Sequence, residues 1–300
     1  MNVDLAQLQT LLAIVDAGSF DDAAIDLGVT ASAVSQRMKS LESAVGAVLL
    51  VRSRPVTPTE HGRRLLRYAR QIALLGTEAE RELRADTKGA ERMTLTVGVN
   101  ADSLAYWFAP VFRELARWPE LSCEFVRSDE NLSLSLLRSG RASGVITTSA
   151  EVAQGCTSTR LGNLRYHAVC SESMYHAVFE TADKSTALIT APMVAYDRDD
   201  SLQHVFRETL TGETSSPPSI SYIPESEQFA VAIAAGLGWG LVPVAQMRSL
   251  PQLRTIDANW HVDVPLYWQR WSIQSPALDR LGAILVTAAS EAGLTLLSSR

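Results

Sequence analysis

Residues 19–41 read Ser-Phe-Asp-Asp-Ala-Ala-Ile-Asp-Leu-Gly-Val-Thr-Ala-Ser-Ala-Val-Ser-Gln-Arg-Met-Lys-Ser-Leu. This stretch predicts two short helices joined by a tight turn at Gly28, which is the arrangement of a helix-turn-helix. In the second helix, Val34, Met38 and Leu41 follow the i, i+4, i+7 spacing of one apolar face. The opposite face is therefore free to meet DNA, which is the first partner to consider.

The polar face of the second helix carries residue types that suit DNA recognition. Gln36 can pair with adenine through two hydrogen bonds, and Lys39 can reach guanine or a phosphate. Thr30 stands at the N-cap position, and the short side chains of Ser32 and Ser35 permit close approach to the major groove. An ordinary amphipathic helix with a solvated polar face is the alternative interpretation of the same stripe.

A basic wing is predicted after this helix. Residues 48–51 form a short β-prone run, and Arg52 and Arg54 follow it. Between residues 37 and 70 the chain has eight basic residues against two acidic ones, although its net charge is −6. Basic charge concentrated on an acidic protein is the electrostatic footprint of a DNA-binding module. The predicted DNA-contacting residues are Thr30, Ser32, Ser35, Gln36, Arg37, Lys39, Arg52 and Arg54.

A long helix is expected from Glu60 to about Asp86. Its apolar residues recur with the alternating three- and four-residue spacing of a coiled-coil seam. These residues are Leu65, Tyr68, Ile72, Leu75 and Ala79. Such a seam predicts a partner helix, and packing against the chain's own domain is the alternative. Residues 87–92 are expected to form a hinge.

From Met93 onward, strand-like and helix-like patterns alternate, which predicts an α/β fold with largely parallel sheets. A single helix is expected over 104–115. The expected strands are 95–99, 122–126, 144–148, 166–170, 193–196 and 240–243.

The order of these elements, with Thr59-Glu60-His61-Gly62 after the wing, resembles the LysR-type transcriptional regulators over the whole chain. Three segments are similar to the ArgP/LysG group of that family: Ala-Val-Ser-Gln-Arg-Met-Lys-Ser-Leu-Glu (33–42), Val-Asn-Ala-Asp-Ser-Leu-Ala (99–105) and Val-Pro-Leu-Tyr-Trp-Gln-Arg-Trp (264–271). Residues 140–144 lack the aspartate that many LysR-type chains carry there, and the ArgP/LysG group shares this lack. The resemblance implies a regulator that responds to a basic amino acid, with lysine, arginine and histidine as candidates.

The resemblance also implies a domain plan and partners. The implied units are a winged helix-turn-helix DNA-binding domain at 1–59, a linker and dimerisation helix at 60–86, a hinge at 87–92 and a two-lobed, periplasmic-binding-protein-like effector domain at 93–300. The first lobe would comprise about 93–162 and 266–300, and the second about 163–265. The implied partners are double-stranded promoter DNA, further copies of the chain in a homodimer or homotetramer, and RNA polymerase, and the implied target is an amino-acid exporter gene.

Loops at the ends of predicted strands supply candidate effector-binding residues. Asn100, Asp102 and Ser103 lie between a strand and a helix, where ligands of open α/β sheets gather, although helix capping explains Asp102 or Ser103 equally well. Carboxylates after two other strands suit a cationic side chain, although acidic loop residues are often simply solvated. The full predicted set is Asn100, Asp102, Ser103, Asp129, Glu130, Thr147, Thr148, Asp197 and Ser226.

An enzyme is the competing class, and the chain offers little material for one. The glycine-rich segment 236–240 follows a helical pattern and precedes a strand, which reverses the order of the dinucleotide-binding fingerprint. The five histidines and three cysteines show neither metal-ligand spacing nor a disulfide framework. We therefore expect no catalysis, metal or cofactor. A regulator that senses a different small metabolite, and an architectural DNA-binding protein that senses nothing, are both compatible with the same sequence.

The sequence also bears on location. No apolar run is long enough to span a bilayer, and the N-terminal Met-Asn-Val-Asp-Leu lacks the basic and hydrophobic regions of a signal peptide. We expect a cytoplasmic protein without a membrane partner.

Overall fold

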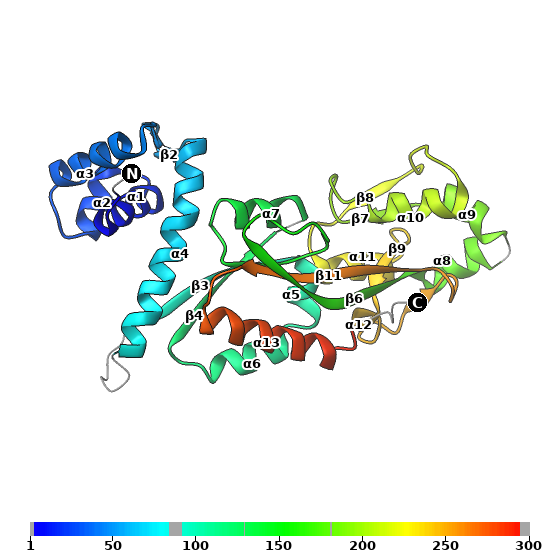
Figure 1. The fold of residues 1–300 in the computed structure, drawn as a ribbon. Coiled ribbons are helices and arrows are strands. Elements are labelled where there is room, and N and C mark those ends of the chain that lie inside the picture. Colours follow the sequence, from blue (N-terminus) through cyan, green and yellow to red (C-terminus); the bar gives the residue numbers. More distant parts are fainter. Residues whose placement is uncertain (1–2, 84–91, 129, 181, 295–300) are drawn as a thin grey trace.

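The computed structural model describes residues 3–83, 92–128, 130–180 and 182–294. Figure 1 shows a small helical domain at the N-terminus, a long helix that leads away from it, and a larger α/β domain. Among the described residues, none of the helices is both long enough and apolar enough to cross a membrane.

The N-terminal domain is the predicted helix-turn-helix. Helices α1 (Leu5–Ala17), α2 (Phe20–Asp26) and α3 (Ala31–Val45) pack around one core. Val34 and Leu41 of α3 are completely buried there, as their spacing predicts. The turn between α2 and α3 contains Gly28, whose φ of 64° lies in the left-handed region that glycine adopts without steric cost.

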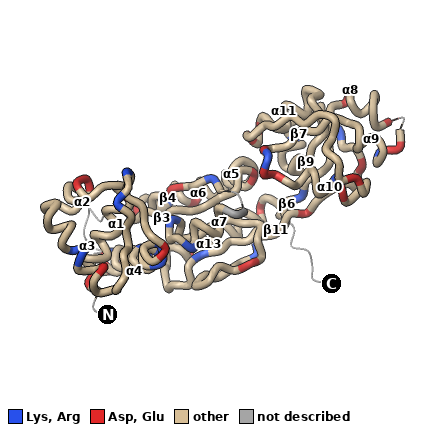
Figure 2. Tube along the Cα trace, turned by 90° about the horizontal axis from the view of Figure 1, so that it is seen from above, with Lys and Arg blue, Asp and Glu red and all other residues tan. Residues whose placement is uncertain are grey.

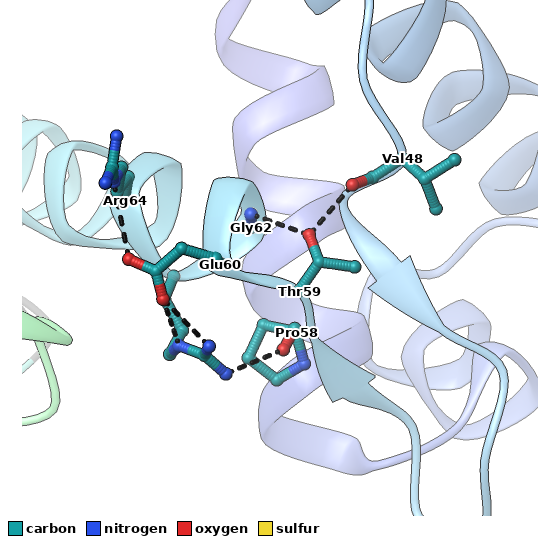
Figure 3. Close-up of polar contacts among 7 residues, drawn as sticks. Val48, Pro58, Thr59, Glu60, Gly62 and Arg64 are labelled. Carbon is teal, nitrogen blue, oxygen red and sulfur yellow. Dashed lines mark hydrogen bonds and ion pairs between the residues drawn. The ribbon is translucent and has the colours of Figure 1, made fainter.

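The wing consists of β1 (Leu50–Val51) and β2 (Thr57–Pro58), which pair antiparallel. Thr59 connects this wing to helix α4 (Glu60–Leu83), as Figure 3 shows. Its hydroxyl donates to the Val48 carbonyl oxygen at 2.8 Å and accepts from the Gly62 N–H at 3.1 Å. A Cβ atom at Gly62 would lie only 2.0 Å from the Leu49 carbonyl oxygen. Thr59 and Gly62 thus let α4 begin directly against the wing.

Helix α4 has one face on its own chain and another in solvent. Leu66, Ala69 and Leu74 are buried. Of the predicted seam, Tyr68, Ile72 and Leu75 are 52%, 39% and 37% exposed, whereas Leu65 packs against the N-terminal core. Residues 84–86, the predicted end of this helix, and 87–91 of the predicted hinge lie outside the described residues.

The C-terminal domain is built on a seven-stranded sheet. Its strands are β3 (Met93–Val99), β4 (Leu121–Arg127), β5 (Gly144–Thr147), β6 (Cys156–Ser171), β9 (Gly240–Pro243), β10 (Leu253–Thr255) and β11 (His261–Trp271). Strand β3 pairs in parallel with β4 and β5, whereas β6 pairs antiparallel with β9, β10 and β11, and β11 antiparallel with β5. The prediction of largely parallel sheets is therefore wrong for this sheet, because its two longest strands run in opposite directions.

Strands β6 and β11 lie side by side and run through both halves of the domain (Figure 1). Their register shifts between Leu266 and Tyr267, where β6 carries one extra residue, Leu161. Gly162, beside it, has a φ of 136°. The predicted strand at 166–170 is only the end of β6. The earlier part was not predicted because residues 157–160 are exposed and polar and show no strand-like alternation.

The first lobe contains β3, β4, β5 and four helices. These are α5 (Ala101–Tyr106), α6 (Ala109–Ala116), α7 (Glu130–Arg138) and α13 (Pro276–Glu291). Helices α6 and α13 lie on one side of the sheet and α7 on the other (Figure 1). The single helix predicted over 104–115 is wrong: α5 ends at Tyr106, and Pro110 lacks the N–H that a continuous helix would need at that position.

The second lobe contains β9, β10 and a parallel pair, β7 (Met193–Ala195) and β8 (Ile220–Tyr222). Its helices are α8 (Glu172–Met174), the π-helix η1 (Tyr175–Phe179), α9 (Lys184–Thr190), α10 (Leu202–Thr211), α11 (Ser226–Ala234) and α12 (Val244–Met247). Strands β6, β7 and β9 and helix α11 supply a small core through Val169, Val194, Val242 and Phe229.

Candidate DNA-binding surface and lobe junction

The polar face of α3 is open to solvent. Ser32, Gln36 and Lys39 are exposed, whereas Ser35 and Arg37 are partly buried at the edges of that face. Because the apolar face of α3 is fixed in the core, these side chains project from the domain in one direction. The helix thus presents the hydrogen-bonding groups that a major-groove helix needs.

The start of α3 is defined by Thr30, which occupies the N-cap position. Its hydroxyl accepts a hydrogen bond from the Ala33 N–H at 3.2 Å. Thr30 is exposed, and the remaining N–H groups of the first turn point toward the same side. This geometry suits contact with a DNA phosphate.

The wing places its arginines on the surface. Arg52 and Arg54 are both exposed. The Arg52 guanidinium lies 5.5 Å from the centre of the Phe20 ring, at the start of α2. This cation–π contact orients Arg52 toward the helix-turn-helix while leaving its charge accessible. In Figure 2, basic segments lie along α3, and acidic segments gather around α9 and α10 at the other end of the molecule.

The two lobes of the C-terminal domain meet at Asp102. One carboxylate oxygen accepts from the Tyr166 hydroxyl at 2.7 Å, and the other accepts from the Ser226 hydroxyl at 2.7 Å. The Ser226 carbonyl oxygen accepts in turn from Tyr106 at 2.9 Å and from Gln246 at 2.8 Å. We call these five residues the lobe junction. They come from α5 of the first lobe, from β6, and from α11 and α12 of the second lobe.

The surroundings of the lobe junction disfavour the ionised form of the Asp102 carboxyl. Burial raises the pKa of the Asp102 carboxyl, and the nearby Asp200 carboxylate raises it further, while the hydrogen bonds from Tyr166 and Ser226 oppose this shift. Burial and Asp102 together raise the pKa of Tyr166 well above its usual value. The junction is therefore a place where a positively charged group would be stabilised.

Four buried polar atoms, in α5 and in the segments that follow β3, β5 and β7, have no hydrogen-bond partner among the described residues. They are Asn100 Oδ1, Ser103 Oγ, Thr148 Oγ1 and the Tyr196 hydroxyl. Asn100 and Ser103 flank Asp102 in the chain, Thr148 follows β5, and Tyr196 follows β7. Because buried polar groups are normally hydrogen-bonded, these atoms indicate a place for a polar ligand.

The remaining predicted effector residues make local contacts or are described only in part. Asp197 accepts from the N–H groups of Asp199 and Asp200, each at 2.9 Å, and so closes its own turn. Thr147 accepts from the Ser149 N–H at 3.2 Å. Glu130 is the first residue of α7, and Asp129 lies outside the described residues.

Sequence reasoning missed Tyr106, Tyr166 and Gln246, and it did not single out Tyr196. Tyr166 and Asp102 are 64 positions apart, and Ser226 and Asp102 are 124 apart. Tyr166 and Ser226 reach Asp102 only because β6 and α11 pack against α5. No group of three or more histidine, cysteine, aspartate or glutamate side chains within the described ranges is placed to hold a metal ion.

Comparison with known proteins finds a family match for each of the two domains. Residues 5–63 match the family model of the bacterial regulatory helix-turn-helix protein, lysR family, and residues 88–290 match the LysR substrate binding domain. The lysine export transcriptional regulatory protein LysG of Corynebacterium efficiens is 39% identical over 291 residues, which cover 96% of this chain and 98% of that protein.

Two solved structures resemble the whole chain. ArgP from Mycobacterium tuberculosis is 39% identical, with a TM-score of 0.88 over 96% of this chain and 98% of that one. LysG from Corynebacterium glutamicum, solved with bound effector Arg, is 37% identical, with a TM-score of 0.81 over the same shares of the two chains. The predicted winged helix-turn-helix, long helix and two-lobed α/β domain are thereby confirmed as the fold. The chain belongs to the LysR family of bacterial transcriptional regulators.

Proposed function

We propose that this regulator binds a basic amino acid, namely lysine, arginine or histidine, at the lobe junction. The observation that carries the proposal is the Asp102 carboxylate, whose charge is disfavoured by burial and by Asp200. A cationic ligand would offset both effects, whereas an anionic one would add to them. The arginine bound to LysG of C. glutamicum supports the same ligand class.

The unpartnered atoms suggest how an amino acid would be held. The acceptors Asn100 Oδ1 and Asp102 suit a cationic group, and the hydroxyls of Ser103 and Thr148 suit the α-carboxylate. Tyr196, across the junction, could donate to either end of the ligand. Ligand contacts from both lobes would favour one relative position of the lobes, so binding would shift the regulator between two states.

The output we propose is altered contact with promoter DNA. Gln36 and Lys39 would read bases, and Thr30, Ser32, Ser35, Arg37, Arg52 and Arg54 would contact bases or phosphates nearby. The exposed seam of α4 would pair two copies, and an amino-acid exporter gene is the proposed target. RNA polymerase is the proposed further partner.

Thermal unfolding in the presence of each of the twenty amino acids tests this proposal. A ligand at one hundred times its Kd stabilises a protein by about 2.7 kcal/mol, which is a readily measured shift. We expect a shift with one or more of lysine, arginine and histidine, and none with glutamate or leucine. If no basic amino acid shifts the transition, the effector proposal fails, and a shift with another metabolite would identify the competing effector class.

A further inference from the structure

Helix α4 has polar contacts with both domains: besides the two anchors described next, Arg67 and Arg81 donate to the Gln154 and Glu120 carbonyl oxygens of the first lobe, at 3.2 and 3.3 Å. Toward its N-terminal half, Arg70 forms an ion pair with Asp16 of α1, at 2.6 Å. Toward its C-terminal half, Glu78 accepts hydrogen bonds from Ser275 at 2.7 Å and from the Ala277 N–H at 3.1 Å. The anchors are eight residues apart, or about 12 Å along a helix with a rise of 1.5 Å per residue. One rigid element thus links the DNA-binding domain to the first lobe.

Direct packing between the two domains is loose beside these anchors. A cavity of about 550 Å³ lies between α1, α4 and the edge of the sheet at β3 and β4. Leu12 and Asp16 line it on one side, and Glu124 and Val126 on the other. Because the facing surfaces leave this space, the polar contacts of α4 have a large share in fixing the domain orientation.

Glu78 lies at a chemically defined place, the N-terminus of α13. Ser275 is fully buried and caps this helix by accepting from the Leu278 N–H at 3.2 Å. The Glu78 carboxylate is favoured there by the free N–H groups and by the positive end of the helix dipole. Its second oxygen is buried without a hydrogen-bond partner among the described residues. The contact therefore needs an acceptor oxygen at this position of α4.

The same helix end is joined directly to the strand that both lobes share. Strand β11 ends at Trp271, four residues before Ser275. Arg270 of β11 donates to the carbonyl oxygens of Trp271 and Ile273, at 3.3 and 3.2 Å, and forms an ion pair with Asp279 of α13. These contacts stiffen the connection, so a movement of β11 would carry Ser275 with it.

We propose that Glu78 is the positioning residue through which the two lobes set the direction of α4 and hence of the DNA-binding domain. The chain of contacts runs from β11 through Ser275 to Glu78, and from α4 through Arg70 to Asp16. The test below has two arms. The DNA arm adds promoter DNA alone and does not depend on the proposed function, whereas the arginine arm also adds arginine and rests on that function.

The DNA arm uses amide hydrogen exchange of the full-length chain with and without a promoter fragment from beside its own gene. In the wild type, DNA should change the exchange of the first-turn amides of α13, residues 277–279. In Glu78→Ala this response should disappear, and in Glu80→Ala, an exposed residue on the same helix, it should persist. Glu78→Gln, which keeps the side-chain length and one acceptor oxygen, should retain part of it and guards against misfolding of the alanine variant. A wild type without this response, or a Glu78→Ala variant that retains it, overturns the inference.

The arginine arm measures DNA affinity by fluorescence anisotropy and arginine affinity by calorimetry. Allosteric factors are commonly about 5- to 150-fold. The quantity compared is the ratio of the DNA affinities with and without arginine. In Glu78→Ala we expect this ratio to fall below about twofold. The arginine Kd should stay within about twofold of wild type. An unchanged factor in Glu78→Ala contradicts the inference and leaves the effector proposal standing. Absence of arginine binding in the wild type contradicts the effector proposal, and the DNA arm then decides the role of Glu78.

Discussion

At the scale of single residues, Asp102 has the largest predicted effect on ligand binding. Asp102→Asn keeps the size of the side chain but removes the charge that a cationic effector would pair with. We expect arginine affinity to weaken by about 1.5–3 kcal/mol, the usual contribution of a hydrogen bond to a charged group. Titration calorimetry measures this change, and Asp199→Asn, at an exposed position, is the control expected to match wild type. If the two variants bind arginine with equal affinity, Asp102 does not contact the effector.

The pH dependence of binding follows from the same residue. The pKa of Asp102 is raised above its usual 3.8, so its contribution to folding stability is fully present below pH 3.8 and is lost as the pH rises through the folded-state pKa. A cationic effector requires the ionised form. Arginine affinity should therefore fall as the pH is lowered through this raised pKa, and the Asp102→Asn profile should be flat in that range. A wild-type slope that persists in the variant would point to another titrating group.

Gln36 and Arg52 are expected to act differently on DNA. Gln36→Ala should relax discrimination at one base position by about 1–3 kcal/mol, because it removes hydrogen bonds to a base edge. Arg52→Ala should weaken all sequences alike and reduce the salt slope by about one unit, because it removes a phosphate contact. Binding to a panel of single-base operator variants at several salt concentrations separates the two. Unchanged base preference in Gln36→Ala would show that α3 presents a different face to DNA.

At the scale of elements, the junction between the wing and α4 depends on Gly62. In Gly62→Ala, the new Cβ would meet the Leu49 carbonyl oxygen at 2.0 Å, so the backbone must shift. We expect a loss of about 1–3 kcal/mol of folding free energy, as for other overpacked sites. Urea unfolding measures it, with His61→Ala at the neighbouring exposed position as the control. A Gly62→Ala variant as stable as the control would mean that α4 can move away from the wing at little cost.

Element prediction succeeded where the pattern is local and failed where distant segments decide. The i, i+4, i+7 stripe of α3 and the apolar alternation of β3 were sufficient to place those elements. The full length of β6 and its antiparallel pairing with β11 were not predicted, because exposed polar residues form the first part of that strand, 157–160. The same applies to the lobe junction: Asp102 and Ser226 were predicted from their places beside strands and helices, but Tyr106, Tyr166 and Gln246 join them only through tertiary contacts.

At the scale of the whole molecule, the structure is a chain of three units along which charged residues are unevenly distributed (Figure 2). Basic residues of the helix-turn-helix end lie on α3 and in the wing, whereas α2 of the same domain is acidic, and further acidic residues gather on the second lobe around α9 and α10. Basic side chains on α3 and in the wing favour approach to DNA by that surface, whereas the acidic second lobe would be repelled. Helix α4 connects the units and has polar contacts to each, so we expect any change at the lobe junction to reach α3 through this helix.

The most direct test of this account is the affinity of the full-length chain for its promoter fragment, measured by fluorescence anisotropy with and without saturating arginine, lysine or histidine. The account predicts that at least one of these amino acids changes the affinity by about fivefold or more, the lower end of common allosteric factors, and that leucine and glutamate leave it unchanged. The same affinity with and without every basic amino acid would contradict the account.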